Sequence, residues 1–238
     1  MRVLARQVRL SGVVLRLRDV AESHRVVDFL SLEEGRVALL ARGARRSRKR
    51  FQGLLDLFQS LTVSATVAPG LWSLDGAELV SGRFGIRRDL DGVRRASLLV
   101  EITSALTGPQ QVVPEIYQAL SAGLDAVDHG ELSRAALALP ALLRAAGLVS
   151  AASHCGGCGR ARPERVALGT SGRLLCGTCA AGRPLLPATV FAAQSSAEVS
   201  AEQARLLEAS VVDLVEAAIG RSLKSARVWA SLADHRAR

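Results

Sequence analysis

Aromatic residues are scarce in this sequence of 238 residues. Phe, Trp and Tyr together make up 3% of the chain, as five Phe, two Trp and one Tyr. A ladder of aromatic side chains that stacks many nucleic-acid bases is therefore excluded as the main mode of binding. Because 49% of the residues are hydrophobic, we expect a folded protein whose cores are built mainly from Leu, Val and Ala. The length suffices for two modest domains or one large one.

Long hydrophobic runs are also missing. Uncharged runs such as Ala135–Leu143 are too short to span a bilayer. Arginines interrupt the N-terminal residues, and Val13–Leu15 is far too short for the apolar core of a secretion signal. We therefore expect a soluble cytoplasmic protein. The chain has four cysteines, and in a reducing compartment these are not expected to form structural disulfides.

The motifs of common enzyme classes are absent. The sequence has no P-loop, no GxGxxG after a strand, no GxSxG and no paired-carboxylate motif. His129-Gly130-Glu131 matches the first half of the zinc deaminase motif, whose second half requires a proline before a cysteine pair. That half fails, because His154 precedes Cys155 and Leu175 precedes Cys176. We expect a protein that is not an enzyme, with His129 in a polar turn.

Acidic residues are few in the part of the chain where basic residues concentrate. Residues 1–50 hold 13 Lys or Arg against 5 Asp or Glu, whereas the remainder holds 18 against 17, so nearly the whole net charge of +9 lies at the beginning. Such a concentration favours a polyanionic partner, either nucleic acid or a membrane surface. The alternative is a solvated surface loop. The basic stretch, residues 42–50, contains the candidate nucleic-acid-binding residues Arg42, Arg45, Arg46, Arg48, Lys49 and Arg50.

Short apolar segments in residues 3–80 predict about five strands with no long helix between most of them. The first strand is expected to change the face that it buries partway along. Its even-numbered residues are apolar or small at first, and its odd-numbered residues are apolar afterwards: Val8, Leu10, Gly12 and Val14, then Val13, Leu15 and Leu17. A small antiparallel barrel fits this count, either an OB-fold or an SH3-like barrel. The basic stretch falls between the third and fourth strands. The later segments are Val26–Leu32 and Arg36–Ala41, joined by a hairpin at Glu33-Glu34-Gly35, then Leu54–Val67, and Leu71–Val80 after a Pro69-Gly70 turn, with a further turn at Asp75-Gly76.

Helical periodicity replaces strand alternation after about residue 83. We expect one domain at 1–82 and a second at 83–238. Pro140 should kink the third helix, and Ser200 with Gln203 should form a capping box before the fourth. An arginine-rich lead-in, Arg87, Arg88, Arg94 and Arg95, is a second candidate for binding polyanions. The expected helices are Val93–Leu106, Pro114–Val127, Glu131–Leu148, Ala201–Ile219 and a last segment Ser222–Leu232.

All four cysteines fall into two pairs of the form Cys-x-x-Cys. Cys155 and Cys158 form the first pair, and Cys176 and Cys179 the second, with 17 residues between them. This spacing is typical of a zinc site with four thiolate ligands, which leaves no open position and is therefore structural. The alternatives are a redox dithiol, or a zinc position whose metal is replaced by disulfides in some conditions. His154 adjoins the first pair but is not needed as a ligand.

The basic stretch, the cysteine pairs and a C-terminal motif occur together in one family. The chain resembles the bacterial DNA repair protein family RecO in Gly43-Ala-Arg-Arg-Ser-Arg-Lys-Arg-Phe-Gln-Gly53, in the two cysteine pairs and in Gly220-Arg-Ser-Leu-Lys-Ser225. The family's final motif commonly continues with Arg and an aromatic residue, whereas this chain has Ala226-Arg227-Val228-Trp229. The resemblance covers nearly the whole chain.

The resemblance implies a fold and a function. It implies an OB-fold followed by a helical domain with a zinc-binding insertion at about 153–182, and one structural Zn²⁺ per chain. It implies a non-enzymatic protein, associated with the bacterial nucleoid, that binds single- and double-stranded DNA and anneals complementary strands. The implied partners are RecR, single-strand-binding protein and, indirectly, RecA, but no membrane. Arg221 and Lys224 of the C-terminal motif join the candidate DNA-binding residues.

Two other functions fit the same residues. One is an RNA-binding protein with an OB-fold and a zinc ribbon, and the other is a zinc-stabilised scaffold whose basic stretch binds an acidic protein. Phe51, which closes the basic stretch, has two interpretations as well. It could stack on a base, but we favour a core residue that anchors the stretch.

Overall fold

The structure is a computed structural model that describes residues 6–46, 51, 53–150, 153–192 and 197–228. The chain divides into two units. The barrel unit comprises Met1–Phe84 and Thr107–Tyr117, and the helical unit comprises Gly85–Leu106 and Gln118–Arg238. Each unit is described separately below.

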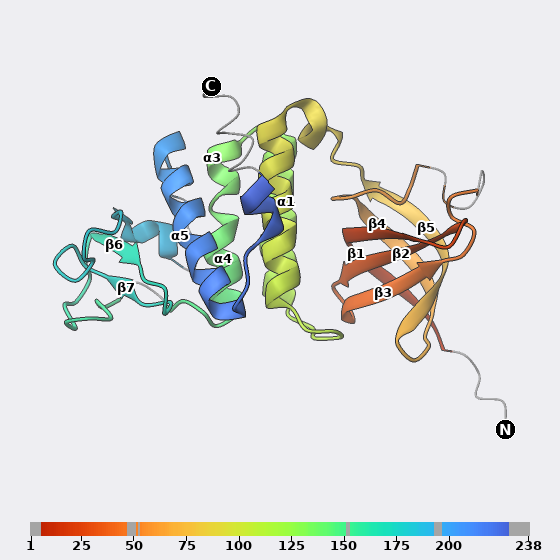
Figure 1. Ribbon diagram of the computed structural model, residues 1–238, viewed down its shortest axis with the longest axis horizontal. Helices are drawn as coiled ribbons and strands as arrows, with labels where there is room; N and C mark the ends of the chain where they lie inside the picture. Colours follow the sequence, from red (N-terminus) through yellow and green to blue (C-terminus); the bar gives the residue numbers. More distant parts are fainter. Residues whose placement is uncertain (1–5, 47–50, 52, 151–152, 193–196, 229–238) are drawn as a thin grey trace. The chain divides into compact units, whose positions relative to one another are not determined.

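Five strands form a closed barrel in the barrel unit, as expected (Figure 1). Around the barrel the strands follow the order β1-β2-β3-β5-β4, and all neighbours are antiparallel except β3 and β5. This arrangement is the OB type of five-stranded Greek-key barrel. The strands are β1 (Gln7–Val20), β2 (His24–Ser31), β3 (Gly35–Ala41), β4 (Ser60–Thr66) and β5 (Leu71–Ser81).

The predicted change of face in the first strand is a β-bulge. The register between β1 and β2 shifts between Val14 and Arg16, and Val13 and Val14 are both fully buried. A bulge turns successive side chains to the same side and tightens the bend that closes a barrel. Gly12 makes close packing possible just before it, since a Cβ there would lie 2.3 Å from the carbonyl oxygen of Leu30.

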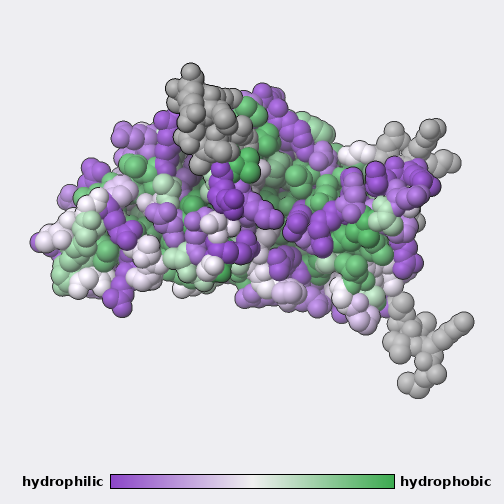
Figure 2. Space-filling model, in the orientation of Figure 1, coloured by the Kyte–Doolittle hydropathy of each residue, from purple (hydrophilic) through white to green (hydrophobic). Residues whose placement is uncertain are grey.

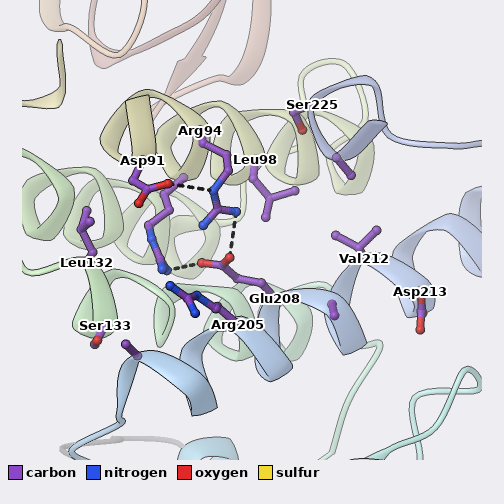
Figure 3. A pocket seen from close by; sticks show the side chains of 14 residues that line it. Asp91, Arg94, Leu98, Leu132, Ser133, Arg205, Glu208, Val212, Asp213 and Ser225 are labelled. Carbon is purple, nitrogen blue, oxygen red and sulfur yellow. Dashed lines mark hydrogen bonds and ion pairs between the residues drawn. The ribbon is translucent and has the colours of Figure 1, made fainter. Parts of the chain in front are cut away.

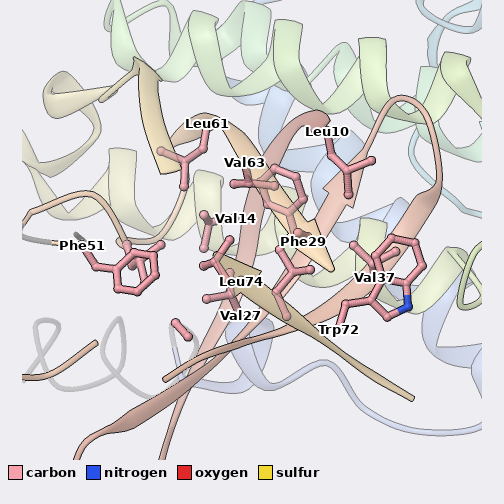
Figure 4. Close-up of a cluster of buried hydrophobic side chains, with 14 residues drawn as sticks. Leu10, Val14, Val27, Phe29, Val37, Phe51, Leu61, Val63, Trp72 and Leu74 are labelled. Carbon is pink, nitrogen blue, oxygen red and sulfur yellow. The ribbon is translucent and has the colours of Figure 1, made fainter. Parts of the chain in front are cut away.

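The barrel core contains Phe51, so its interpretation as an anchor is confirmed. Its side chain is 4% exposed and belongs to the same buried cluster as Phe29 and Leu74 (Figure 4). The basic stretch is thereby fastened to the barrel at its C-terminal end.

Two predictions for this unit were wrong. The strand expected over Leu54–Val67 begins only at Ser60, because residues before it form turns. There the buried side chain of Gln59 accepts the N–H of Asp56 at 3.2 Å, and Phe58 adopts a φ of +71°. The pair Asp75-Gly76 makes no hairpin turn but lies inside β5, opposite the point where the β4–β5 register shifts.

The 107–117 segment, which includes the first residues of the helix α2 (Pro114–Asp128), packs on the barrel. The N–H of Gln110 donates to the carbonyl oxygen of Arg36 at 2.9 Å, and Arg36 pairs with Pro109 in a parallel bridge. Gly35 is required at this contact, because its φ is +67° and a Cβ would lie 2.2 Å from the carbonyl oxygen of Gln111. The barrel unit is therefore discontinuous in sequence.

Helices dominate the second unit. Helix α5 packs against α1, α3 and α4 and against a small three-stranded sheet in the order β7-β6-β8 (Figure 1). The sheet was not expected from the sequence, whereas the capping box of Ser200 and Gln203 at the start of α5 is confirmed. The elements are η1 (Phe84–Arg88), α1 (Leu90–Leu106), α2 (Pro114–Asp128), α3 (Leu132–Ala135), α4 (Ala138–Ala145), β6 (Arg165–Leu168), β7 (Leu174–Leu175), β8 (Leu186–Pro187), η2 (Ala188–Phe191) and α5 (Ala201–Ile219).

The third predicted helix, Glu131–Leu148, is broken rather than kinked. It consists of α3 and α4, with a break at Ala136 and Leu137. Pro140 thus lies in the first turn of α4, where its missing N–H would have no helical partner. The last predicted helix, Ser222–Leu232, is helical over residues 224–228, and its remaining residues lie outside the described part of the chain.

Among the described residues, none of the helices combines the length and the apolar character needed to cross a membrane. On the face shown in Figure 2, hydrophobic residues form patches between hydrophilic ones.

Candidate metal centre and nucleic-acid interface

The four cysteines lie together at one end of the small sheet. Their sulfur atoms all lie within 4.8 Å of one another, although the two pairs are separated in sequence. Cys176 directly follows β7, and its N–H donates to the Sγ of Cys155 at 3.2 Å. The N–H of Gly157 donates to the same sulfur at 3.4 Å. Two turns therefore present four sulfur atoms around one point, as a tetrahedral metal ion requires.

The thiols of this cluster have pKa values that diverge. Backbone N–H groups, first that of Cys176 and then those of Cys158 and Gly157, lower the pKa of Cys155 to about 6. Hydrogen bonds with the neighbouring thiols, first that of Cys158, raise the pKa of Cys179 to about 12. Without a cation the crowded sulfurs share protons, because four adjacent thiolates repel one another. A divalent soft metal ion stabilises all four thiolates at once, so the donor set fits a structural metal.

His154 does not belong to this cluster. Its ring is exposed, and its Nδ1 lies 3.1 Å from the Oγ of Ser153. The four sulfur atoms alone make a complete set of ligands.

The basic stretch begins in the turn that follows β3, between the third and fourth strands as expected. Arg42, Arg45 and Arg46 are exposed there. Backbone hydrogen bonds hold this turn against the β1–β2 turn, since the N–H of Arg45 donates to the carbonyl oxygen of Ser23 at 3.1 Å and that of Gly43 to the Nδ1 of His24 at 3.0 Å. The other candidates of the stretch, Arg48, Lys49 and Arg50, lie outside the described residues.

Two acidic residues, Asp19 near the end of β1 and Glu22 in the β1–β2 turn, pair with the basic stretch. Arg46 lies 3.1 Å from a carboxylate oxygen of Glu22, and Arg45 lies 3.6 Å from one of Asp19. Arg25 of β2 donates to Asp19 at 2.8 Å, and this hydrogen bond is the main reason why the pKa of Asp19 is lowered. Arg25, Asp19 and Glu22 could not be recognised from the sequence, because only the folded β1–β2 hairpin brings them to the stretch.

A cavity of about 540 Å³ lies beside the basic stretch. Arg25, Arg45 and Asp56 contribute polar side chains to its lining, and Phe51 contributes an apolar one. Two arginines against one carboxylate give this cavity a net positive lining, which suits an anion such as a phosphate group.

Two carboxylates hold the C-terminal motif in place. Glu101 of α1 accepts the N–H groups of Lys224 and Ser225 at 2.8 and 2.7 Å, and Glu216 of α5 accepts that of Leu223 at 2.7 Å. Burial acts to raise the pKa of Glu101, but the hydrogen bonds from Ser225 and Lys224 together lower it. Leu223 is fully buried. The backbone of the motif is therefore fixed.

The basic side chains of this motif belong to a different unit from the basic stretch. Arg221 and Lys224 are both exposed, and both lie in the helical unit, whereas Arg42, Arg45 and Arg46 lie in the barrel unit. The described candidates are therefore distributed over both units.

Part of the arginine-rich lead-in is engaged inside the helical unit. Arg95 of α1 is 7% exposed and forms an ion pair with Glu208 of α5, and Arg94 lies 2.8 Å from the same carboxylate (Figure 3). Burial lowers the pKa of Arg95, and Glu208 opposes that effect. These residues line a cavity of about 740 Å³ between α1 and α5. Arg95 is therefore a buried structural residue and not an exposed phosphate ligand.

Comparison with known proteins agrees with these features. The model of the family described as "Recombination protein O N terminal" matches residues 1–83, and that described as "Recombination protein O C terminal" matches residues 87–227. A DNA repair protein RecO from Anaeromyxobacter sp. (strain K) is 40% identical over 185 residues, which cover 75% of this chain and 72% of that protein. Another, from Geobacter metallireducens, is 34% identical over 181 residues, which cover 72% of each chain. The chain therefore belongs to the RecO family of recombination proteins.

Proposed function

We propose that this protein is a non-enzymatic recombination mediator in DNA repair. It binds single- and double-stranded DNA, anneals complementary strands and, together with RecR, helps to load RecA onto single strands coated with single-strand-binding protein. We propose that it acts in the bacterial cytoplasm, at the nucleoid. The observation that carries the proposal is a cluster of exposed arginines on an OB-type barrel in a chain of the RecO family.

The basic stretch provides the physical basis of annealing. Two complementary strands must bring their phosphate backbones together, and their mutual repulsion opposes this approach. Arginine and lysine side chains replace condensed counterions and lower that repulsion without reading the bases. Arg42, Arg45 and Arg46, together with Arg48, Lys49 and Arg50, serve this role, and Arg221 with Lys224 offers a second group of charges in the helical unit.

We propose that the metal is one structural Zn²⁺ per chain, bound by Cys155, Cys158, Cys176 and Cys179. A set of four thiolates selects a soft ion and leaves no position for substrate. The metal then links the cysteine turn after β7 to the turn that precedes β6 and supports the fold of the helical unit, rather than any reaction.

A strand-annealing assay tests the function. Complementary oligonucleotides are coated with single-strand-binding protein, and annealing is followed with and without this protein. If six basic residues contact phosphates, a plot of log K against log salt for single-stranded DNA has a slope of about −4, at roughly −0.7 per phosphate. Replacing Arg45, Arg46 and Arg48 with Ala should reduce the slope magnitude by about 2 and slow annealing in parallel.

Two comparisons sharpen this assay. A control triple variant, with Arg160, Arg162 and Arg173 replaced by Ala, removes the same charge from the helical unit instead of the barrel unit and should keep the wild-type slope. The converse variant Glu22→Gln releases Arg46 from its ion pair and should tighten binding slightly at low salt, since an exposed pair contributes only about 0–1 kcal/mol. Tighter binding to RNA of the same sequence, or to an acidic peptide, would contradict the proposal, as would unchanged annealing in the first triple variant.

A further inference from the structure

Phe84 is the one phenylalanine of the chain with a largely exposed side chain. The sequence contains five Phe, and four of them, Phe29, Phe51, Phe58 and Phe191, are at most 4% exposed, whereas Phe84 is 69% exposed. Leaving a large apolar side chain in water forgoes the stabilisation that its burial would give. In a protein with so few aromatic residues, this position points to a contact with something outside the chain.

The backbone on the N-terminal side of Phe84 is held rigidly. Arg83 is 3% exposed, and its Nη1 donates to the carbonyl oxygen of Phe58 at 2.7 Å and to the Oγ of Ser60 at 2.8 Å. Arg83 adopts a φ of +43°, which is unfavourable for a residue other than glycine. The buried guanidinium therefore fixes a strained residue whose conformation sets the direction of the next side chain.

The ring of Phe84 lies against the backbone of Gly82. A Cβ built on Gly82 would lie 2.3 Å from both Cε2 and Cζ of the ring, so no other residue fits beneath it. Because the peptide backbone supports the ring and most of the ring surface is in solvent, the side chain forms a flat aromatic platform. A planar, apolar ligand group is the natural complement of such a platform.

Two arginines follow Phe84 within the same short helix. Phe84 begins η1, and Arg87 and Arg88 form its last turn and are exposed, with no acidic residue in the first turn. Residues three apart eclipse one another in a 3₁₀ helix, so Arg87 follows the same face as Phe84. Ile86, which is fully buried, takes the opposite side. The turn itself therefore places a positive charge next to the aromatic ring.

We propose that Phe84 stacks on a base of single-stranded DNA while Arg87 and Arg88 bind the adjoining phosphates. The inference rests on the proposed DNA binding. It predicts that this turn makes the protein bind unpaired strands more tightly than it otherwise would. Phosphate contacts by the basic stretch do not distinguish single strands from duplex, but the face of a base is available only when the base is unpaired. Stacking on an aromatic side chain contributes about 1–3 kcal/mol per base and tolerates any sequence.

The experiment compares the affinity of full-length variants for a 20-nucleotide oligo(dT) and for a duplex of equal length. Phe84→Ala should weaken binding to the single strand about 5- to 150-fold, as expected for one lost stack, and change duplex binding less than about twofold. Phe84→Tyr should bind like wild type. Phe84→Leu keeps an apolar side chain without the ring and should resemble Phe84→Ala. The matched control is Val80→Ala, which removes another exposed apolar side chain (66% exposed) from the barrel unit.

The salt dependence separates stacking from charge. Phe84→Ala should leave the slope of log K against log salt unchanged, whereas the double variant Arg87→Ala/Arg88→Ala should reduce its magnitude by about 1.4. An oligonucleotide carrying 5-iodouracil should crosslink to Phe84. The inference would be overturned if Phe84→Ala lost the same factor of affinity for the single strand and for the duplex. Wild-type affinity of this variant for the single strand would overturn it as well. Failure of the wild-type protein to bind DNA would instead refute the proposed function. If Phe84→Ala unfolds, the inference is tested by the single-strand affinities of Phe84→Leu and Phe84→Tyr and by the crosslink to Phe84.

Discussion

Individual carboxylates control the positions of the basic residues proposed to bind DNA. In the barrel unit, Asp19 and Glu22 pair with Arg45 and Arg46, so phosphate groups must compete with weak exposed ion pairs. In the helical unit, Glu101 binds backbone N–H groups instead. The backbone at Lys224 is therefore fixed by Glu101, while the ammonium group of the Lys224 side chain takes no part in this hydrogen bond.

Glu101 should make the stability of the helical unit depend on pH. Its pKa is lower in the folded protein than in an unfolded chain, so its contribution is complete above the unfolded value of about 4.3 and is lost as the pH falls through the folded value. We expect Glu101→Gln to reduce the free energy of unfolding by about 1–2 kcal/mol at pH 7. The difference from wild type should shrink below about pH 4.

Denaturant unfolding of both proteins between pH 3 and pH 7 measures this effect. Glu202→Gln, which changes an exposed carboxylate in the first turn of α5, serves as the control and should follow wild type throughout. If the free energy of unfolding of Glu101→Gln is lower than that of wild type by the same amount at every pH, the loss of the Glu101 charge is not the cause of the lower stability.

Short elements rather than long helices create the metal centre. β7 has two residues and β6 has four. Cys176 directly follows β7, whereas the turn of Cys155 and Cys158 precedes β6 in the sequence. The N–H of Gly156 donates to the carbonyl oxygen of Leu174 at 2.8 Å, which ties the first cysteine turn to β7. Strands this short bury little surface, so we expect the region to depend on the proposed metal for stability.

Removal of the metal should therefore destabilise the helical unit selectively. Purified protein should contain one zinc per chain, and Cys158→Ser/Cys176→Ser should lose it together with more than about 3 kcal/mol of stability. DNA binding by the barrel should weaken less. His154→Ala, next to Cys155, is the matched control and should retain zinc. Metal analysis, thiol titration and urea unfolding measure these outcomes, and four titratable thiols in the folded wild-type protein would contradict the assignment.

Sequence patterns predicted elements where neighbouring residues alone decide the structure. Alternation located the barrel strands, and the capping box marked the start of α5 at Ser200. The apolar alternation of the sequence also continued through the turns before Ser60, but burial there does not alternate, since Phe58, Gln59 and Ser60 are buried in succession. The buried Glu208 could have been found, since it lies on the same helical stripe as Ala204, Val211 and Val215.

Other features depend on contacts between distant residues. The cysteine set was evident from spacing alone, but the ion pair of Arg46 with Glu22 and the bonds of Glu101 to the C-terminal motif join residues that no local pattern relates. The exposure of Phe84 is equally hidden, because it results from the strained backbone of Arg83.

At the scale of the whole molecule, the barrel unit includes a segment that comes after α1 in the sequence. The 107–117 segment covers Gly35 and Arg36 of β3. The closed strand order does not require it, since all five barrel strands precede residue 82. We therefore expect residues 1–82 to retain the barrel as a separate domain, but with less stability than in the full chain.

A fragment that ends at Leu90 tests this expectation. It should be soluble and β-rich by circular dichroism, bind DNA weakly and unfold at lower urea concentration than the barrel of the full chain. In the full chain, Gly35→Ala should displace the 107–117 segment and accelerate amide hydrogen exchange in β3. If the fragment is unfolded while the full chain is stable, the barrel depends on later residues and the boundary near residue 82 is wrong.

The discontinuous barrel unit also sets an order of events during synthesis. All five strands are synthesised once Ser81 has been added. At about 5–20 residues per second, the ribosome then needs roughly 2–7 s to add the residues from Gly82 to Tyr117. A small barrel of this kind folds within milliseconds to seconds. The nascent barrel therefore exists for a time with the backbone of Arg36 uncovered, and an unpaired backbone of this kind is a point at which nascent chains on neighbouring ribosomes can associate.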